Sequence, residues 1–152
     1  MTLTAYRLSL RRFDRQAFSG EGARRAGGRW NPRGVPLIYA SATLSLAALE
    51  FLVHLSGPQD APDLVYFRVQ FDSRLVTEAK LPKHWLKLKL RDTRALGRAW
   101  VEKAVSPVLQ VPSFVIPAEM NFLLNPAHTS FEQIKIERAR PFALDARLHR
   151  PS

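Results

Sequence analysis

One carboxylate stands out in this sequence because its surroundings are apolar. Glu50 lies in the segment Ala47–Val53, in which every other residue is alanine, leucine, phenylalanine or valine. Burying an ionised carboxyl group among such side chains costs free energy unless the group is paired or used in chemistry. One interpretation is therefore a carboxylate that is paired with another group or used in chemistry. The other is that Glu50 marks the solvent-facing stripe of an amphipathic helix.

Arginine and glycine are concentrated in the N-terminal part of the chain. Residues 1–33 hold eight arginines and only two carboxylates, and five of the seven glycines lie between residues 19 and 34. Glycine lets backbone N–H groups approach an anion, and arginine supplies a planar charged fork. The pattern favours a phosphate-bearing ligand, although neither standard glycine-rich nucleotide motif is present. A flexible loop whose arginines face water is the alternative.

Aromatic and hydroxyl side chains add further candidates. Tyr39 ends an apolar run shortly before Glu50, so a turn between them can bring both side chains to one pocket rim. Arg29 and Trp30 can bind a pyrophosphate and stack a base or nicotinamide ring, or can equally form a surface cation–π pair. Ser113 places one hydroxyl between apolar segments, without the paired histidine that nucleophilic catalysis would need.

Periodicity and turn residues predict the elements that must position these side chains. Apolar spacing predicts helices over Thr43–Leu55, stopped by Gly57-Pro58, and over Asp92–Val105, capped by Asp92. Short apolar or alternating runs predict strands at Ala5–Leu8, Val35–Ala40, Leu64–Phe71, Val108–Val111, Phe114–Ile116, Asn121–Leu124, Gln133–Ile136 and Phe142–Leu144. The predicted fold class is α+β, with a mainly antiparallel β core and flanking helices.

Length and composition limit the class of protein. The chain has 152 residues, 46% of them hydrophobic, which suits one domain over residues 1–152 with its own core. It has no cysteine, and its four histidines lack ligand spacing, so we expect no disulfide and no metal site. No apolar run has the length of a membrane span or of a signal-peptide core. We therefore expect a cytoplasmic protein that does not enter the membrane.

The formal net charge of +10 has a second source besides the N-terminal arginines. Residues 80–103 hold eight lysines and arginines and only two carboxylates. A basic nucleic-acid-binding module is one interpretation, although no helix-turn-helix, RRM or KH signature is present. A surface for an acidic protein partner is the other.

Several blocks of the sequence, in the same order, resemble the RES-domain toxins. They are residues 19–31 (SGEGARRAGGRWN), Val35–Tyr39, the LAALE run ending at Glu50, Val53–Leu55, Val111–Ser113, and Asn121–Pro126 followed by His128. Together they extend over nearly the whole chain. The resemblance implies a fold similar to that of ADP-ribosyltransferases and an enzyme that consumes NAD as its substrate, with no resident cofactor.

The resemblance also implies roles for individual residues. Arg29 and Glu50 match the arginine and glutamate of the family name, and Tyr39 matches the active-site tyrosine. Ser113 matches the serine, although some members carry a serine just before the second helix, where this chain has Arg91–Arg94 without one. The predicted catalytic set is Arg29, Tyr39, Glu50 and Ser113. The predicted NAD-binding set is Arg7, Arg29, Trp30, Tyr39 and Asn121.

At the level of function, the resemblance implies the toxin of a type II toxin–antitoxin pair. Its partner would be an Xre-family helix-turn-helix antitoxin, through which alone it would contact DNA, and a homodimer within the complex is left open. Family members break the nicotinamide–ribose bond with water or phosphate, as a glycohydrolase or phosphorylase, or transfer ADP-ribose to a protein. All three acceptors stay open at this point. An acidic surface of the antitoxin is the partner we expect for residues 80–103.

Overall fold

A single mixed sheet organises the computed structural model, which describes residues 1–55 and 62–149. In these ranges its elements are β1 (Thr2–Leu10), α1 (Glu21–Ala26), β2 (Ile38–Ser41), α2 (Leu44–Leu52), β3 (Leu64–Asp72), β4 (Val76–Glu78), α3 (Leu90–Glu102), β5 (Val108–Pro112), β6 (Met120–Leu124), β7 (Lys135–Ile136) and β8 (Arg140–Phe142). The strand order is β4-β5-β6-β2-β1-β3-β7, and β8 also pairs with β3. Neighbouring strands are antiparallel except for the parallel pair β4 and β5.

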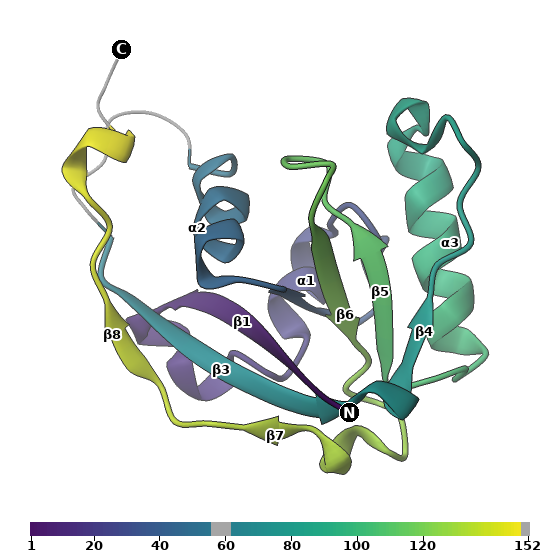
Figure 1. Ribbon diagram of the computed structural model, residues 1–152, viewed down its shortest axis with the longest axis horizontal. Coiled ribbons are helices and arrows are strands. Elements are labelled where there is room, and N and C mark those ends of the chain that lie inside the picture. Colours follow the sequence, from purple (N-terminus) through teal and green to yellow (C-terminus); the bar gives the residue numbers. More distant parts are fainter. Residues whose placement is uncertain (56–61, 150–152) are drawn as a thin grey trace.

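The short strand β2 joins two larger halves of the sheet. On one side, β1 pairs with β3 along its whole length, and on the other side β5 and β6 form a hairpin. Figure 1 shows α2 and α3 rising on either side of the β5–β6 hairpin, with α1 behind the sheet. Helix α2 packs against β1 and β2, which meet at the centre of the strand order. The middle of the sheet therefore lies directly beside the helix that carries Glu50.

Successive side chains of a strand point to opposite faces of the sheet. In the central strands β2 and β6, side chains on both faces are buried. Leu124 of β6 packs with Ile38 in one hydrophobic cluster, whereas Leu123 packs in another with Trp30 and Trp100. Trp100 belongs to α3, so this second cluster fixes α3 against the sheet. Burial on both faces makes this part of the sheet a rigid support for the segments above it.

The structure confirms the predicted α+β class and most of the predicted elements, with some boundaries shifted. The strand predicted for Phe114–Ile116 is wrong: these residues form a bend in which the Ser113 hydroxyl accepts the N–H groups of Val115 and Ile116. Such local side-chain bonds compete with strand pairing. The strand predicted over Gln133–Ile136 is reduced to β7, and the one predicted over Phe142–Leu144 is shifted to Arg140–Phe142, so that only Phe142 is shared.

The helix ends also differ from the sequence predictions. Thr43 caps α2 by accepting the Leu46 N–H over 3.1 Å, as a capping threonine should. Helix α3 begins two residues before Asp92, which acts inside the first turn by accepting the Lys89 N–H over 3.1 Å. The predicted helix stop at Gly57-Pro58 lies outside the described residues.

Helix α1 was not predicted, because its segment reads as a glycine-rich loop. Gly20 and Gly27 flank the helix with φ values of 77° and 71°, a left-handed backbone that glycine adopts without strain. The helix is thus short and bounded by glycines on both sides. Within the described ranges, no helix is long and apolar enough to cross a membrane.

Candidate active site

A cavity of about 560 Å³ lies between the sheet, α2 and the loop that follows α1. Its wall includes six of the residues that the sequence singled out: Arg7, Arg29, Trp30, Tyr39, Glu50 and Asn121. They come from β1, the loop before β2, β2 itself, α2 and β6. The fold therefore brings together at one cavity residues that are more than a hundred positions apart in the chain.

Glu50, on the last turn of α2, is held by two side chains from other elements. Its Oε1 atom accepts one hydrogen bond from the Ser113 hydroxyl and one from the Asn121 amide, each over 2.7 Å. Its Oε2 atom receives no hydrogen bond from any residue in the described ranges. The carboxylate is half-buried and lines the cavity. Within the described ranges, Oε1 of Glu50 is thus held in place by two donors, while Oε2 has no hydrogen-bond partner.

Ser41 extends this network below the carboxylate. Its hydroxyl donates to Oδ1 of Asn121 over 2.7 Å, and both residues are buried. Because Ser41 fixes the amide oxygen of Asn121, the amide nitrogen must point towards Glu50. Ser41 and Asn121 are also paired across β2 and β6, so the sheet register places them side by side.

Ser113 is fully buried at the end of β5, outside the residues that line the cavity. Its oxygen accepts the Val115 and Ile116 N–H groups, which leaves its hydrogen to be donated to Glu50. The serine therefore orients the carboxylate. This geometry assigns it a hydrogen-bonding role, whereas nucleophilic attack would require an exposed oxygen and a base.

Tyr39 of β2 binds the loop over residues 27–31 through its hydroxyl group. Its hydroxyl donates to Oδ1 of Asn31 over 2.5 Å and accepts the backbone N–H of Trp30 over 3.0 Å. Burial raises the pKa of Tyr39 to about 12, against the smaller opposing effects of these hydrogen bonds and of the charges of Arg94 and Arg29. The hydroxyl is therefore protonated at neutral pH and remains a donor to Asn31.

Glycine is required where this loop crosses the tyrosine. A Cβ atom built on Gly28 would lie 2.5 Å from the Tyr39 hydroxyl oxygen and 2.9 Å from Oδ1 of Asn31. Asn31 itself is fully buried, and its amide nitrogen donates to the carbonyl oxygens of Ala23 and Val35. The GGRWN stretch is thus a packed structure rather than a flexible loop.

Arg7 places a partly buried positive charge in the cavity wall. Its Nε donates to the Ala17 carbonyl over 2.7 Å, and one terminal nitrogen donates to the Tyr39 carbonyl over 2.9 Å. Burial lowers the pKa of Arg7 to about 10, which still leaves the guanidinium charged at neutral pH. In the chain as described, Arg7 forms no ion pair with a carboxylate. An anionic ligand would supply the missing negative charge.

Arg29 lies at the surface of the cavity, with its guanidinium carbon 4.2 Å from the centre of the Phe114 ring. The surface cation–π pair with its neighbour Trp30, one of the two interpretations of the sequence, is wrong, because Trp30 is only 2% exposed and packs in the core. A ring so deeply buried has little surface on which a base or nicotinamide could stack. The Phe114 ring in turn contacts Trp85, with ring centres 5.2 Å apart.

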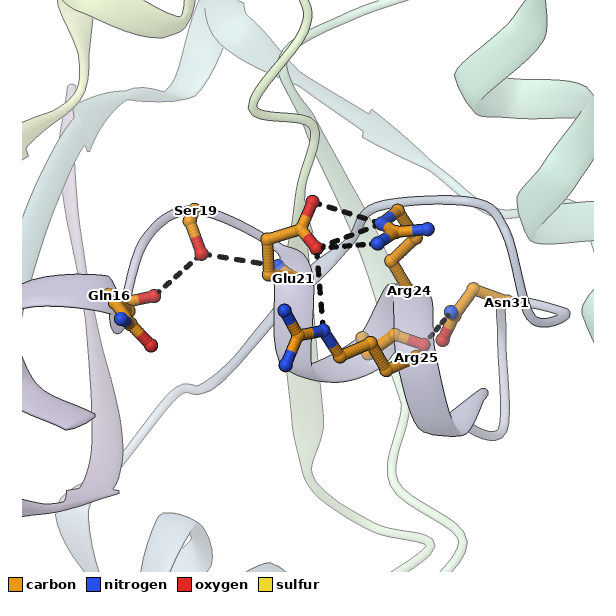
Figure 2. Close-up of polar contacts among 7 residues, drawn as sticks. Gln16, Ser19, Glu21, Arg24, Arg25 and Asn31 are labelled. Carbon is orange, nitrogen blue, oxygen red and sulfur yellow. Dashed lines mark hydrogen bonds and ion pairs between the residues drawn. The ribbon is translucent and has the colours of Figure 1, made fainter. Parts of the chain in front are cut away.

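Three of the other N-terminal arginines form ion pairs with carboxylates and do not line the cavity. Figure 2 shows Arg24 and Arg25 turned towards Glu21 on α1, with the closest N–O distances 2.8 Å and 3.8 Å. Arg11 pairs in the same way with Asp63. Of the eight arginines in residues 1–33, Arg7 and Arg29 are the two that line the cavity. Of the arginines expected to bind phosphate, Arg7 and Arg29 are thus the two candidates at the cavity.

Sequence reasoning missed several residues that hold the site. No pattern in the sequence marks Ser41 as part of the site, and Phe114 is expected only as part of a strand. Thr93 lies in the stretch where some family members carry a serine, and its hydroxyl donates to the Arg29 carbonyl over 2.5 Å. The signal that marks it is a hydroxyl group of either type, serine or threonine, in this stretch.

Among the residues described, no group of three histidine or acidic side chains could hold a metal ion.

Comparison with known proteins gives the family. The RES domain model matches residues 4–145. A protein named Toxin Res from Yersinia enterocolitica is 36% identical, with 94% of this chain and 97% of that protein covered. A Prs ADP-ribosylating toxin from a Sphingobium species is 32% identical over 99% of both chains.

A solved structure shares the fold. It is that of the M. tuberculosis MbcT–MbcA toxin–antitoxin complex, at a TM-score of 0.69 and 18% identity, with 94% of this chain and 85% of that chain covered. Its identity is too low to support more than a shared fold. The family model and the relatives, however, agree along nearly the entire sequence: this chain belongs to the RES domain family.

Proposed function

We propose that this protein is the toxin of a type II toxin–antitoxin pair and acts by breaking the nicotinamide–ribose bond of NAD. One observation carries the proposal: Oε1 of Glu50 is fixed by Ser113 and Asn121, while, among the described residues, Oε2 receives no hydrogen bond and Arg7 of the same cavity wall forms no ion pair. Two relatives are named Toxin Res and Prs ADP-ribosylating toxin, which supports the same class of activity.

The chemistry requires a negative charge beside the ribose. As the bond between ribose C1′ and the nicotinamide nitrogen breaks, its electron pair leaves with nicotinamide, and C1′ acquires oxocarbenium character. A fixed carboxylate stabilises that positive charge, as in glycosidases. Glu50 supplies it in our proposal. A nucleophile then adds to C1′; when that nucleophile is water, the products are nicotinamide, ADP-ribose and a proton.

The cavity also offers charge for the other end of the dinucleotide. Arg7 and Arg29 line it and present guanidinium groups, which bind phosphate oxygens through paired N–H donors. Arg7 is anchored by two carbonyl oxygens, so its position is set before any ligand binds. Holding the pyrophosphate in this way would keep the scissile bond beside Glu50.

Three acceptors for ADP-ribose remain in the proposal: water, phosphate and a protein side chain. Protein transfer is favoured by the name of the Sphingobium relative, which describes an ADP-ribosylating toxin. We place NAD breakdown first because Glu50 and the arginines suffice for it. Incubating the purified protein with NAD, with and without phosphate, and identifying the ADP-ribose product separates the acceptors.

The central test is Glu50→Gln. Glutamine keeps an oxygen that can accept from Ser113 and Asn121, so the fold should persist while the negative charge is lost. We expect the rate of NAD consumption to fall by about a hundredfold or more, and toxicity on expression to disappear. Glu119→Gln, which changes a carboxylate that does not line the cavity, is the matched control. Full NAD consumption by a folded Glu50→Gln protein would refute the proposal.

An antitoxin partner belongs to the same proposal. The structural neighbour is the toxin–antitoxin complex of MbcT and MbcA. We propose an Xre-family antitoxin, bound in part by the exposed basic side chains around the start of α3, at Lys80, Lys83, Lys87, Lys89 and Arg91. Contact with DNA would then be made by the antitoxin. A cytoplasmic location suits an enzyme that consumes free NAD.

Direct nucleic-acid binding is the less favoured function. Arg11, Arg24 and Arg25 are already paired with carboxylates, and Arg7 lies inside the cavity wall. The N-terminal arginines therefore supply less free positive charge than their number suggests. Strong salt-sensitive binding of DNA by the isolated protein would reverse this preference.

A further inference from the structure

Helix α3 contacts the backbone of the loop over residues 27–31, which carries Arg29, at three successive residues. Arg94 donates through Nε to the carbonyl oxygen of Gly28 over 2.8 Å, and Thr93 donates to that of Arg29 over 2.5 Å. Gly97, one turn further along, lies against Trp30: a Cβ atom there would stand 1.7 Å from the Trp30 carbonyl oxygen. One face of α3 thus meets the carbonyl groups of residues 28, 29 and 30 in order.

The same loop is also held by Tyr39 of β2 and by a hydrogen bond within the loop itself. The Trp30 N–H donates to the Tyr39 hydroxyl over 3.0 Å, and the Gly28 N–H donates to the Asn31 carbonyl over 2.9 Å. The backbone that carries Arg29 is therefore fixed by both sets of contacts, although the Arg29 side chain itself is exposed. The direction in which this side chain leaves the backbone depends on these bonds.

Arg94 differs from the other basic residues of α3. Arg98, one turn later, forms an exposed ion pair with Glu102, with Nε and Oε1 2.7 Å apart. Arg94 forms no ion pair in the described ranges and is partly buried. It also does not line the cavity. A hydrogen bond from a charged donor to a backbone carbonyl is stronger than one between neutral groups. The Arg94 side chain therefore serves to bind the backbone of this loop.

We propose that Arg94 is a positioning residue: its bond to the Gly28 carbonyl holds the loop so that Arg29 lies over Phe114 at the cavity. It acts through Arg29 and does not touch the substrate. This inference rests on the proposed function in one respect, which is that Arg29 binds the phosphates of NAD. Thr93 and Gly97 complete the contact surface of α3.

Two variants separate the hydrogen bond from the charge. Arg94→Met removes both, whereas Arg94→Gln removes the charge but keeps an N–H donor at the same number of bonds from Cα as Nε. We expect Arg94→Met to lower kcat/KM for NAD by about ten- to a hundredfold, mainly through a higher KM. Arg94→Gln should recover most of that loss. Arg98→Met, on the same helix, is the control and should leave both constants unchanged.

The coupling to Arg29 is tested in a double variant. If Arg94 acts through Arg29, adding Arg94→Met to Arg29→Met should cause little further loss, because the group that it positions is already gone. Losses that multiply would overturn the proposal. Equal losses in Arg94→Gln and Arg94→Met would also overturn it, since they would assign the effect to charge. So would a lower kcat at unchanged KM, which marks a smaller folded fraction.

A readout independent of activity keeps the inference separate from the proposed function. If the wild-type protein does not consume NAD, the proposed function fails, and amide hydrogen exchange then tests the loop alone. We expect the Gly28 and Trp30 amides to exchange faster in Arg94→Met and at nearly the wild-type rate in Arg94→Gln and Arg98→Met. Unchanged exchange in Arg94→Met would overturn the positioning role.

Discussion

Ser113 donates its hydroxyl hydrogen to Oε1 of Glu50 over 2.7 Å, although 63 positions separate the two residues. The bond joins the end of β5 to the last turn of α2. Because the serine oxygen is occupied by two backbone N–H groups, the direction of the donated hydrogen is fixed. The carboxylate therefore has a defined orientation before any ligand enters the cavity.

Ser113→Ala should loosen both the carboxylate and the bend after β5. The Val115 and Ile116 N–H groups lose their acceptor, so we expect the free energy of unfolding to fall by about 1–3 kcal/mol. The rate of NAD consumption should fall less than in Glu50→Gln, because the charge is still present. Urea unfolding and NAD assays measure the two effects. Ser45→Ala, at an exposed position of α2, should change neither.

Tyr39→Phe should free the loop that carries Arg29. Without the hydroxyl, the Trp30 N–H and Oδ1 of Asn31 lose their partner, which should lower the free energy of unfolding by about 1–3 kcal/mol. The KM for NAD should rise as Arg29 becomes less well positioned. Tyr66→Phe, whose ring packs against Phe142, is the control. A Tyr39→Phe protein with wild-type stability and KM would contradict this role.

The raised pKa of Tyr39 predicts a pH dependence of stability. Its pKa is about 12 in the folded protein and about 10 in the unfolded chain. Between these values the folded state binds more protons, so stability is retained below pH about 10 and lost as pH rises towards 12. Urea unfolding at several pH values in this window should show a steeper loss for wild type than for Tyr39→Phe. Equal slopes would mean that the tyrosine is not buried in solution.

Two glycine substitutions should have opposite effects. Gly97→Ala forces a Cβ atom into the Trp30 carbonyl oxygen, so we expect a loss of about 3 kcal/mol or more in the free energy of unfolding. Gly22→Ala, inside α1, meets no atom within 4 Å and should stabilise the protein by about 0.5–1 kcal/mol. Thermal unfolding of both variants is the measurement. Similar melting temperatures for the two would refute the close packing of α3 on Trp30.

Charge reversal around the start of α3 tests the partner surface. Changing Lys83, Lys87 and Lys89 to Glu should weaken binding of the antitoxin by at least about tenfold at low salt, with less effect at high salt. NAD consumption by the free protein should be unaffected. An equal charge reversal at three exposed positions elsewhere serves as control: Arg15, Arg33 and Lys135. Equal weakening by both sets would remove the lysine segment as a specific surface.

Much of this protein could be predicted from short stretches of sequence. Apolar spacing located α2 and α3, and alternation located β3, because these patterns depend on neighbours a few residues apart. The contrast of Glu50 with its apolar neighbours and the order of the matched blocks also pointed to one site and one family. Local signals failed where a side chain overrode them, as Ser113 does after β5.

Only the tertiary structure decided what each residue contacts. The register of β2 with β6 sets Ser41 beside Asn121, and the packing of α3 sets Arg94 on the Gly28 carbonyl. The ring beneath Arg29 is Phe114, from a distant turn, and not the adjacent Trp30. The amino-acid sequence by itself therefore determined most of the elements, the family and the residues that we propose for the site. Their partners were decided by the fold, because sheet pairing and helix packing join residues whose separation along the chain carries no periodic signal.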